Sequence, residues 1–171
     1  MVDFDEVDTV NLGVQGFYTG EVGLPKVEAV RSRLRAIQRE THVQTFPEAY
    51  RPEALPPRAA VFCCVDSVKV RRQLFRHFCR KDWAVFFDGR MAAESLQVFC
   101  VERQAEAMSA YSEPLFPSHK AFRESCTARA TIYCASMAAA ILCALYKRWA
   151  MNQASEPRLQ CDLFSMNCFR T

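Results

Sequence analysis

The sequence predicts an α/β fold in which helices cover both faces of a doubly wound, mostly parallel sheet. Two runs, AAVFCCV at 59–65 and WAVFF at 83–87, are continuously apolar, as strands buried on both faces are. A helix is predicted between them, at 68–80. Alternating strands and helices build parallel β-α-β units, and 171 residues suit one domain over 1–171.

Further elements are predicted on either side of this unit. The chain opens on the last residues of a strand, because apolar Val2 and Phe4 alternate with aspartates, and a helix with regular apolar spacing begins at Pro25. The remaining elements are alternating strands at 42–46 and 95–102, the second of them antiparallel, a polar stretch at 103–124, a long helix at 127–151 and a final strand at 161–169.

Composition and charge argue against several classes of function. The net charge of +3 comes without a basic stripe, so we expect no nucleic-acid partner. The most apolar stretch, at 131–146, is shorter than the ~20 residues that cross a bilayer, so no membrane anchor is expected. Nine cysteines, mostly in apolar runs and without a CxxC pair, predict neither a disulfide framework nor zinc, and favour a reducing cytoplasm.

Acidic residues follow three of the predicted strands: Asp3 with Asp5, then Asp66, then Asp88. Ligands of doubly wound sheets bind beyond the carboxyl ends of the strands. Asp3 is placed to accept hydrogen bonds from ribose hydroxyls, or is a solvated strand end. Asp66 is placed to bind magnesium beside phosphates, or caps the helix that begins near Val68.

Two other side chains are candidates from their positions. Lys26 lies at the start of a helix, where the macrodipole disfavours a cation, so its partner is an anion such as phosphate or one of the neighbouring acids Glu28 and Glu21. Cys126 lies among polar residues just before the long helix, which lowers the pKa of a thiol there. It is either a nucleophile or an ordinary loop cysteine.

The order and spacing of these residues resemble a known family. The segments are VDFDEVDTVNLGVQ, GLPKVEAVRSRL, VFCCVDSVKVRRQLF and VFFDGRMAAESLQVF. Together they are similar to the ThiF/MoeB/HesA family, relatives of the ubiquitin-activating enzymes, over roughly residues 1–100 and more loosely to about 150. The resemblance implies a Rossmann-like fold and a reaction with ATP and Mg²⁺. It implies adenylation of the C-terminal carboxylate of a small ubiquitin-like or sulfur-carrier protein, with release of pyrophosphate, by a homodimer.

The resemblance also implies roles for particular residues. Asp3 would hold the ribose, Asn11 and Gln15 would lie near the phosphates, and Lys26 would contact them. Asp66 would lie beside Mg²⁺ and the reacting phosphate, as a catalytic residue and metal ligand. Cys126 would accept the activated carrier as a thioester.

The sequence departs from the family pattern at several points. Val14 stands where an arginine is usual, and Ser67 where an asparagine is common; the zinc-binding CxxC pairs are absent, so no zinc is expected. The first strand, its G-x-G-x-x-G loop and the next helix are missing, so we expect an N-terminally truncated fold. One alternative is a catalytically inactive fragment or scaffold of this fold that binds a carrier protein without ATP. Another is a different Rossmann-type enzyme, such as a dehydrogenase or methyltransferase, against which Lys26 and the Asn11/Gln15 pair argue.

Overall fold

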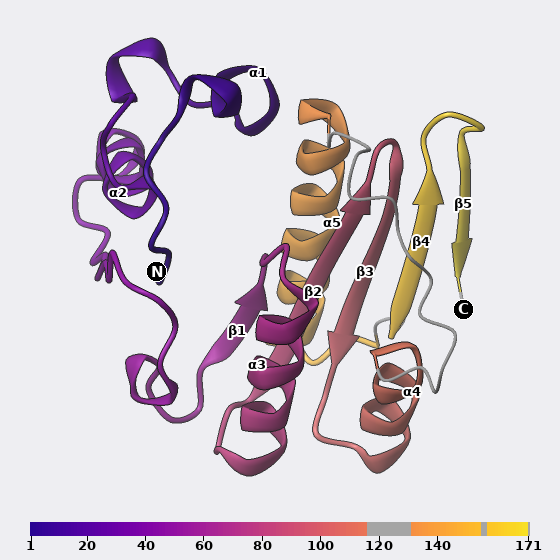
Figure 1. Ribbon diagram of the computed structural model, residues 1–171. Coiled ribbons are helices and arrows are strands. Elements are labelled where there is room, and N and C mark those ends of the chain that lie inside the picture. Colours follow the sequence, from indigo (N-terminus) through magenta and orange to yellow (C-terminus); the bar gives the residue numbers. More distant parts are fainter. Residues whose placement is uncertain (116–130, 155–156, 171) are drawn as a thin grey trace. The chain divides into compact units, whose positions relative to one another are not determined.

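A computed structural model describes residues 1–115, 131–154 and 157–170 of the chain (Figure 1). The chain divides into two compact units, Met1–Leu55 and Pro56–Thr171, and each is described here by itself. The α/β class is confirmed, whereas the single domain over 1–171 stays a prediction.

The first unit is built around one regular helix and several short turns. Its elements are η1 (Thr9–Asn11), α1 (Leu12–Gln15), η2 (Thr19–Glu21), α2 (Lys26–Ile37) and η3 (Pro52–Ala54). Val27 and Ala29 of α2 are buried with Val7 of the opening segment. Helix α2 begins at Lys26, one residue after the predicted start at Pro25, which is its N-cap.

The strand predicted at 42–46 is reduced to one bridge. Phe46 pairs with Val2 in parallel, and the Phe46 amide donates to the Met1 carbonyl at 2.9 Å. Because only one residue pair has bridge geometry, no ladder forms, and the prediction of a strand there is wrong.

The second unit holds a five-stranded sheet in the order β1-β2-β3-β4-β5 (Figure 1). Its elements are β1 (Ala60–Cys63), α3 (Val68–Arg80), β2 (Val85–Ala92), β3 (Ser95–Val101), α4 (Ala105–Leu115), α5 (Ile132–Ala150), β4 (Arg158–Asp162) and β5 (Asn167–Arg170). Helices α3 and α5 begin after hydroxyl caps, because Ser67 Oγ accepts from the Val70 amide and Thr131 Oγ1 from the Cys134 amide, both at 3.4 Å.

The sheet is mixed, so the prediction of a mostly parallel sheet is wrong. Only β1 and β2, which α3 connects, are parallel, and the other three pairings are antiparallel. Strand β2 continues past Asp88 to Ala92 and returns at once as β3. Ala93, in the left-handed conformation at φ 53°, lies in this tight turn, and a turn of this length allows only antiparallel pairing. The tail likewise forms a hairpin of two strands rather than one final strand.

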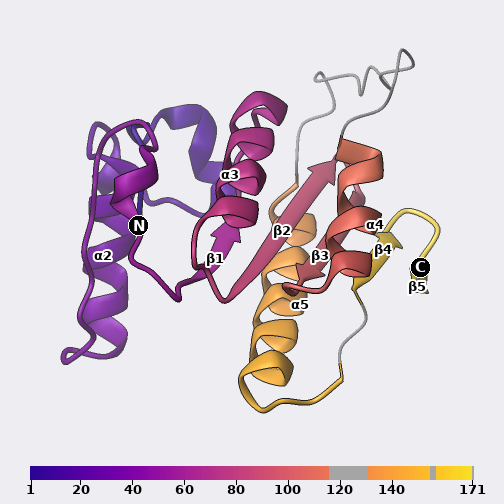
Figure 2. The same ribbon diagram turned by 90° about the horizontal axis from the view of Figure 1, so that it is seen from below.

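Helices cover both faces of this sheet, as predicted. Figure 2 shows α5 on one face and α3 and α4 on the other. The cluster between the sheet and α5 is mostly aliphatic, with Val85, Phe87, Leu96 and Val98 of the sheet buried together with Ala138 and Leu142 of α5. The opposite face is aromatic, with contacts among Phe75, Phe78, Phe86, Phe99 and Tyr111. Helix α4 occupies part of the predicted polar stretch at 103–124, for which no element was predicted.

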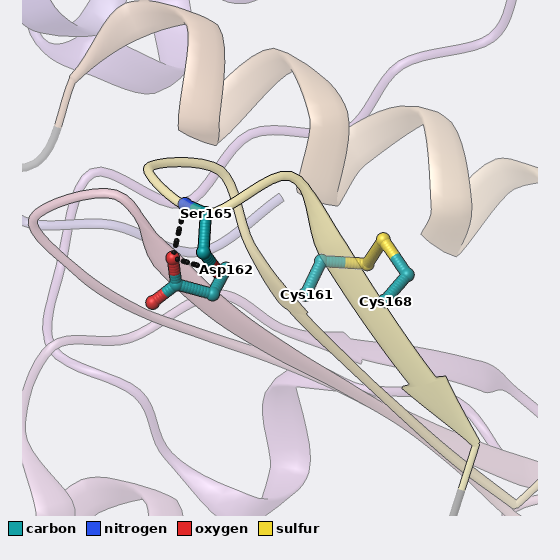
Figure 3. The surroundings of a disulfide bond; sticks show 4 residues. All are labelled: Cys161, Asp162, Ser165 and Cys168. Carbon is teal, nitrogen blue, oxygen red and sulfur yellow. Dashed lines mark hydrogen bonds between the residues drawn. A yellow bond between two sulfur atoms is a disulfide. The ribbon is translucent and has the colours of Figure 1, made fainter.

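A disulfide joins Cys161 of β4 to Cys168 of β5, which corrects the prediction that cysteines stay reduced (Figure 3). The two residues are direct partners in the antiparallel ladder, and paired residues of adjacent strands bring their side chains together. The sequence spacing alone gave no sign of this because it does not reveal the hairpin. No helix in the described segments is long and apolar enough to cross a membrane.

Candidate functional site

Asp3, Asp5 and Lys26 form a small polar cluster in the first unit. Asp3 Oδ1 accepts a hydrogen bond from the Asp5 amide at 2.9 Å. The Lys26 ammonium lies 2.9 Å from Asp5 Oδ2, and Lys26 N donates to the Asp5 carbonyl at 2.9 Å. The partner of Lys26 is therefore Asp5, rather than Glu28 or Glu21.

Sequence reasoning named Asp5 beside Asp3 as a strand-end acid but gave it no role. Successive side chains of an extended segment alternate in direction, so residues two apart such as Asp3 and Asp5 share one side of it. That alternation was the available signal, but it did not reveal that Lys26 would lie beside them. The side chain of Lys26 is 14% exposed and that of Asp5 47%, so Asp5 is the more open partner of this ion pair.

Asn11 has a local structural role. Its Oδ1 accepts from the Asp8 amide at 2.9 Å, while Asp8 Oδ1 accepts from the Val10 amide at 3.2 Å, which makes a capping box. Hydrogen bonds from Val10 and from the Thr9 hydroxyl hold the pKa of Asp8 below its usual value. Gln15 ends α1 four residues later, and its side chain is exposed.

Asp66 lies in the second unit, three residues after β1 ends, and is exposed. Ser67 caps α3, so the alternative role of Asp66 as the helix cap is wrong. Within the described residues its carboxylate makes no hydrogen bond or ion pair. Both oxygens are therefore available to a ligand.

Asp88 is buried in the middle of β2, so its interpretation as a strand-end acid is wrong. Its side chain is 0% exposed and accepts from Arg71 Nε at 2.9 Å, from Arg90 Nε at 2.7 Å and from the Tyr111 hydroxyl at 2.8 Å. Two positive charges and a phenol therefore surround one carboxylate, and this buried network was not predicted. The strand continues past Asp88 because the charge is satisfied inside the protein.

The same network holds the loop that carries Asp66. Arg71 Nη2 donates to the carbonyls of Val65 and Gly89, the second at 3.3 Å. Val65 precedes Asp66 directly, so the position of Asp66 is tied to the buried ion pair through Arg71. Arg71 is thus a positioning residue for the loop.

Burial and Asp88 also affect neighbouring groups. Burial, with a contribution from the Asp88 charge, raises the pKa of the Cys63 thiol to about 12. Burial and Asp88 likewise raise the pKa of Tyr111 far above its usual value. Both groups therefore stay protonated at neutral pH, and neither supplies a base or a thiolate.

The residues fit ATP and magnesium to a limited extent. Mg²⁺ is usually held by one or two carboxylates together with phosphate oxygens, rather than by a cage of protein ligands. Asp66 supplies one free carboxylate, and the described segments contain no group of three or more His, Cys, Asp or Glu residues that could hold a metal alone. Asp3, Asn11, Gln15 and Lys26 all lie in the first unit, whereas Cys126 lies outside the described residues.

Comparisons with known proteins agree on the family. The sequence profile of the ThiF family matches residues 1–171. None of the curated proteins matches the chain. Among solved structures, E. coli MccB is similar with a TM-score of 0.74 at 13% identity, over 99% of this chain and 54% of that one. MccB with AMPCPP and MccA gives 0.72 at 14%, and PaaA gives 0.73 at 14%, each with the same two coverages.

These structural likenesses are at low identity and show the fold. The chain spans about half the length of the solved structures it matches. The family is shown independently, because its profile matches the whole chain. The chain belongs to the ThiF family.

Proposed function

We propose that this chain takes part in the ATP-dependent adenylation of the C-terminal carboxylate of a small ubiquitin-like or sulfur-carrier protein or of a peptide. The observation that carries the proposal is the ThiF-family match over residues 1–171. It is supported by solved structures of MccB, a similar protein, with ATP and with AMPCPP and MccA.

In this reaction a carboxylate oxygen of the carrier attacks the α-phosphorus of ATP, and pyrophosphate leaves. Lys26 offsets phosphate charge, and binding of ATP exchanges its Asp5 contact for a phosphate contact. Asn11 and Gln15 bind near the phosphates and Asp3 holds the ribose. Asp66 is the carboxylate that holds Mg²⁺, which supplies charge neutralisation at the reacting phosphate.

Two further parts of the proposal follow from family resemblance. Cys126 accepts the activated carrier: its thiolate attacks the acyl carbon, AMP leaves, and a thioester forms. The protein works as a homodimer, and its place in the cytoplasm is inferred instead from the cysteines that lie in apolar runs. A Cys126→Ala protein that still forms a reducible carrier adduct would contradict the thioester step.

The test is ATP–pyrophosphate exchange by the 171-residue chain. Each small ubiquitin-like and sulfur-carrier protein encoded in the same genome is supplied in turn, with the same carrier amidated at its C-terminus as the substrate control. We expect exchange with one of these carriers when its C-terminal carboxylate is free, and no exchange with the amidated form of that carrier. Asp66→Asn should lower the exchange rate by about 100-fold or more, since it removes the charge on which metal binding depends. Asp82→Asn, at an exposed aspartate, is the matched control.

Exchange that survives Asp66→Asn would remove Asp66 from the site. Absence of exchange with every carrier would reject the enzymatic proposal itself. The alternative would then be a scaffold that binds a carrier without ATP, which the existing neutralisation of Lys26 by Asp5 favours. Such a scaffold binds its carrier with the same affinity with and without ATP.

A further inference from the structure

Four polar side chains share one face of the sheet in the second unit. Arg90 of β2 is opposite Gln97 of β3, which is opposite Gln160 of β4, and Arg158 of β4 is opposite Phe99. Residues opposite each other in antiparallel strands point to the same face, and so do residues two apart in one strand. We call Arg90, Gln97, Arg158 and Gln160 the arginine floor. All four are partly buried.

The two arginines of this floor are incompletely hydrogen bonded. Across the described residues, the buried side-chain nitrogen or oxygen atoms without a partner are Arg90 Nη2 and Arg158 Nε. Leaving a buried donor unsatisfied costs about 1–3 kcal/mol, and more for a charged group. Both guanidinium groups lie against the Phe99 ring, at 4.4 Å and 5.5 Å from its centroid. Two unsatisfied donors therefore lie around one aromatic side chain.

The charges on this face favour an anion. Asp88 is shared between Arg71 and Arg90, so one carboxylate faces two guanidinium groups. Arg158 makes no ion pair within the described segments and donates only weakly, from Nη2 to Gln160 Oε1 at 3.4 Å. Positive charge is therefore in excess over these three arginines, which favours an anion as the missing partner of the free donors.

The floor begins at the end of the sheet where Asp66 lies. Strands β1 and β2 are parallel, with Cys63 opposite Asp88, so Arg90 lies just beyond the level at which β1 ends. Arg71 joins the two segments, because it donates to the carbonyls of both Val65 and Gly89. A group bound at Arg90 therefore lies at the same end of the sheet as the loop that carries Asp66.

We propose that Arg90 and Arg158 bind the C-terminal carboxylate of the polypeptide substrate. The inference rests on the proposed function, which requires that such a carboxylate be held near Asp66. The planar guanidinium fork matches the two oxygens of a carboxylate, and the Gln97 and Gln160 amides lie beside it for the adjoining peptide groups.

The experiment uses ¹⁵N-arginine-labelled protein and follows the arginine Nε–H resonances by NMR. The probes are N-acetylglycine, the neutral N-acetylglycinamide and sodium phosphate, all without nucleotide. N-acetylglycine should shift the Arg90 and Arg158 resonances in a saturable way, and the amide should not. Arg158→Gln should weaken binding about tenfold, the loss expected for one charge-assisted hydrogen bond, whereas Arg35→Gln at an exposed arginine of α2 should leave it unchanged.

Three results would overturn the carboxylate site. These are equal shifts with the amide, no saturable shift with N-acetylglycine, and tighter binding of phosphate that displaces N-acetylglycine. Circular dichroism of Arg158→Gln establishes that the variant is folded, and Arg158→Lys, which keeps the charge without the fork, should bind with intermediate affinity. The titration contains no nucleotide, so it is independent of the exchange assay. If N-acetylglycine binds but the protein shows no ATP–pyrophosphate exchange, only the proposed function is rejected. If the protein shows exchange but does not bind N-acetylglycine, only this site is rejected.

Discussion

The buried carboxylate of Asp88 should be the most sensitive polar position of the second unit. Replacing it by asparagine removes the charge that Arg71 and Arg90 share and leaves a single acceptor oxygen for three donors. The side chain of Arg71 is only 7% exposed, so its charge would remain buried without compensation. Breaking a buried pair of this kind costs about 3–5 kcal/mol. We expect Asp88→Asn to lower the free energy of unfolding by that amount.

Urea unfolding followed by tryptophan fluorescence measures this loss, because both tryptophans, Trp83 and Trp149, lie in the second unit. Tyr111→Phe removes one of the three hydrogen bonds and should cost about 1–2 kcal/mol. The double variant should lose less than the two single losses together, since both act on one network. Asp82→Asn, at an exposed aspartate, should change stability by less than about 0.5 kcal/mol. A loss below about 1 kcal/mol for Asp88→Asn would refute the reasoning.

Three further outcomes are expected. Lys26→Met should change the free energy of unfolding by less than about 1 kcal/mol, because its partner Asp5 is 47% exposed, but should weaken ATP binding about tenfold in equilibrium dialysis; equal binding would remove Lys26 from the nucleotide site. Gly89→Ala should cost about 1 kcal/mol in urea unfolding, since a Cβ there would lie 3.3 Å from Leu142 Cδ1, whereas Gly20→Ala, in open space, should not destabilise. The Cys63 thiol keeps its proton to about pH 12 when folded but loses it near pH 9 when unfolded, so the unfolding free energy should fall as pH rises through this window, and a Cys63→Ala variant should show a smaller fall.

Elements could be predicted from the sequence where their signals come from residues close together in the chain. Helix α3 lies at the predicted residues, because its apolar spacing and the Ser67 cap are local signals. The β1-α3-β2 unit follows from two apolar runs around that helix. What could not be predicted is pairing across turns. The Ala93 turn and the turn of the tail hairpin each join two strands that pair in antiparallel. Neither turn contains the Asn-Gly or Asp-Gly sequence that would have predicted a hairpin.

The candidate site shows the same division. The presence of an exposed acid after β1 was predictable, since Asp66 directly follows an apolar run. The partner of Lys26 was not, because Asp5 lies 21 residues away in the chain. Asp88 was misread for a physical reason: a charge normally ends a buried strand, but here Arg71, Arg90 and Tyr111 satisfy it from three separate elements.

The Cys161–Cys168 bond has a consequence for the last strand of the sheet. Strand β5 ends the strand order, and such a strand presents unpaired amides and carbonyls on which another chain can add. Phe164 and Phe169 are exposed beside it, which makes intermolecular pairing more favourable. The covalent bond between directly opposed residues prevents β5 from slipping by one residue or from separating from β4. Reduction would therefore free an edge strand that carries the exposed Phe169, and solubility under reducing conditions would depend on how firmly the remaining ladder holds it.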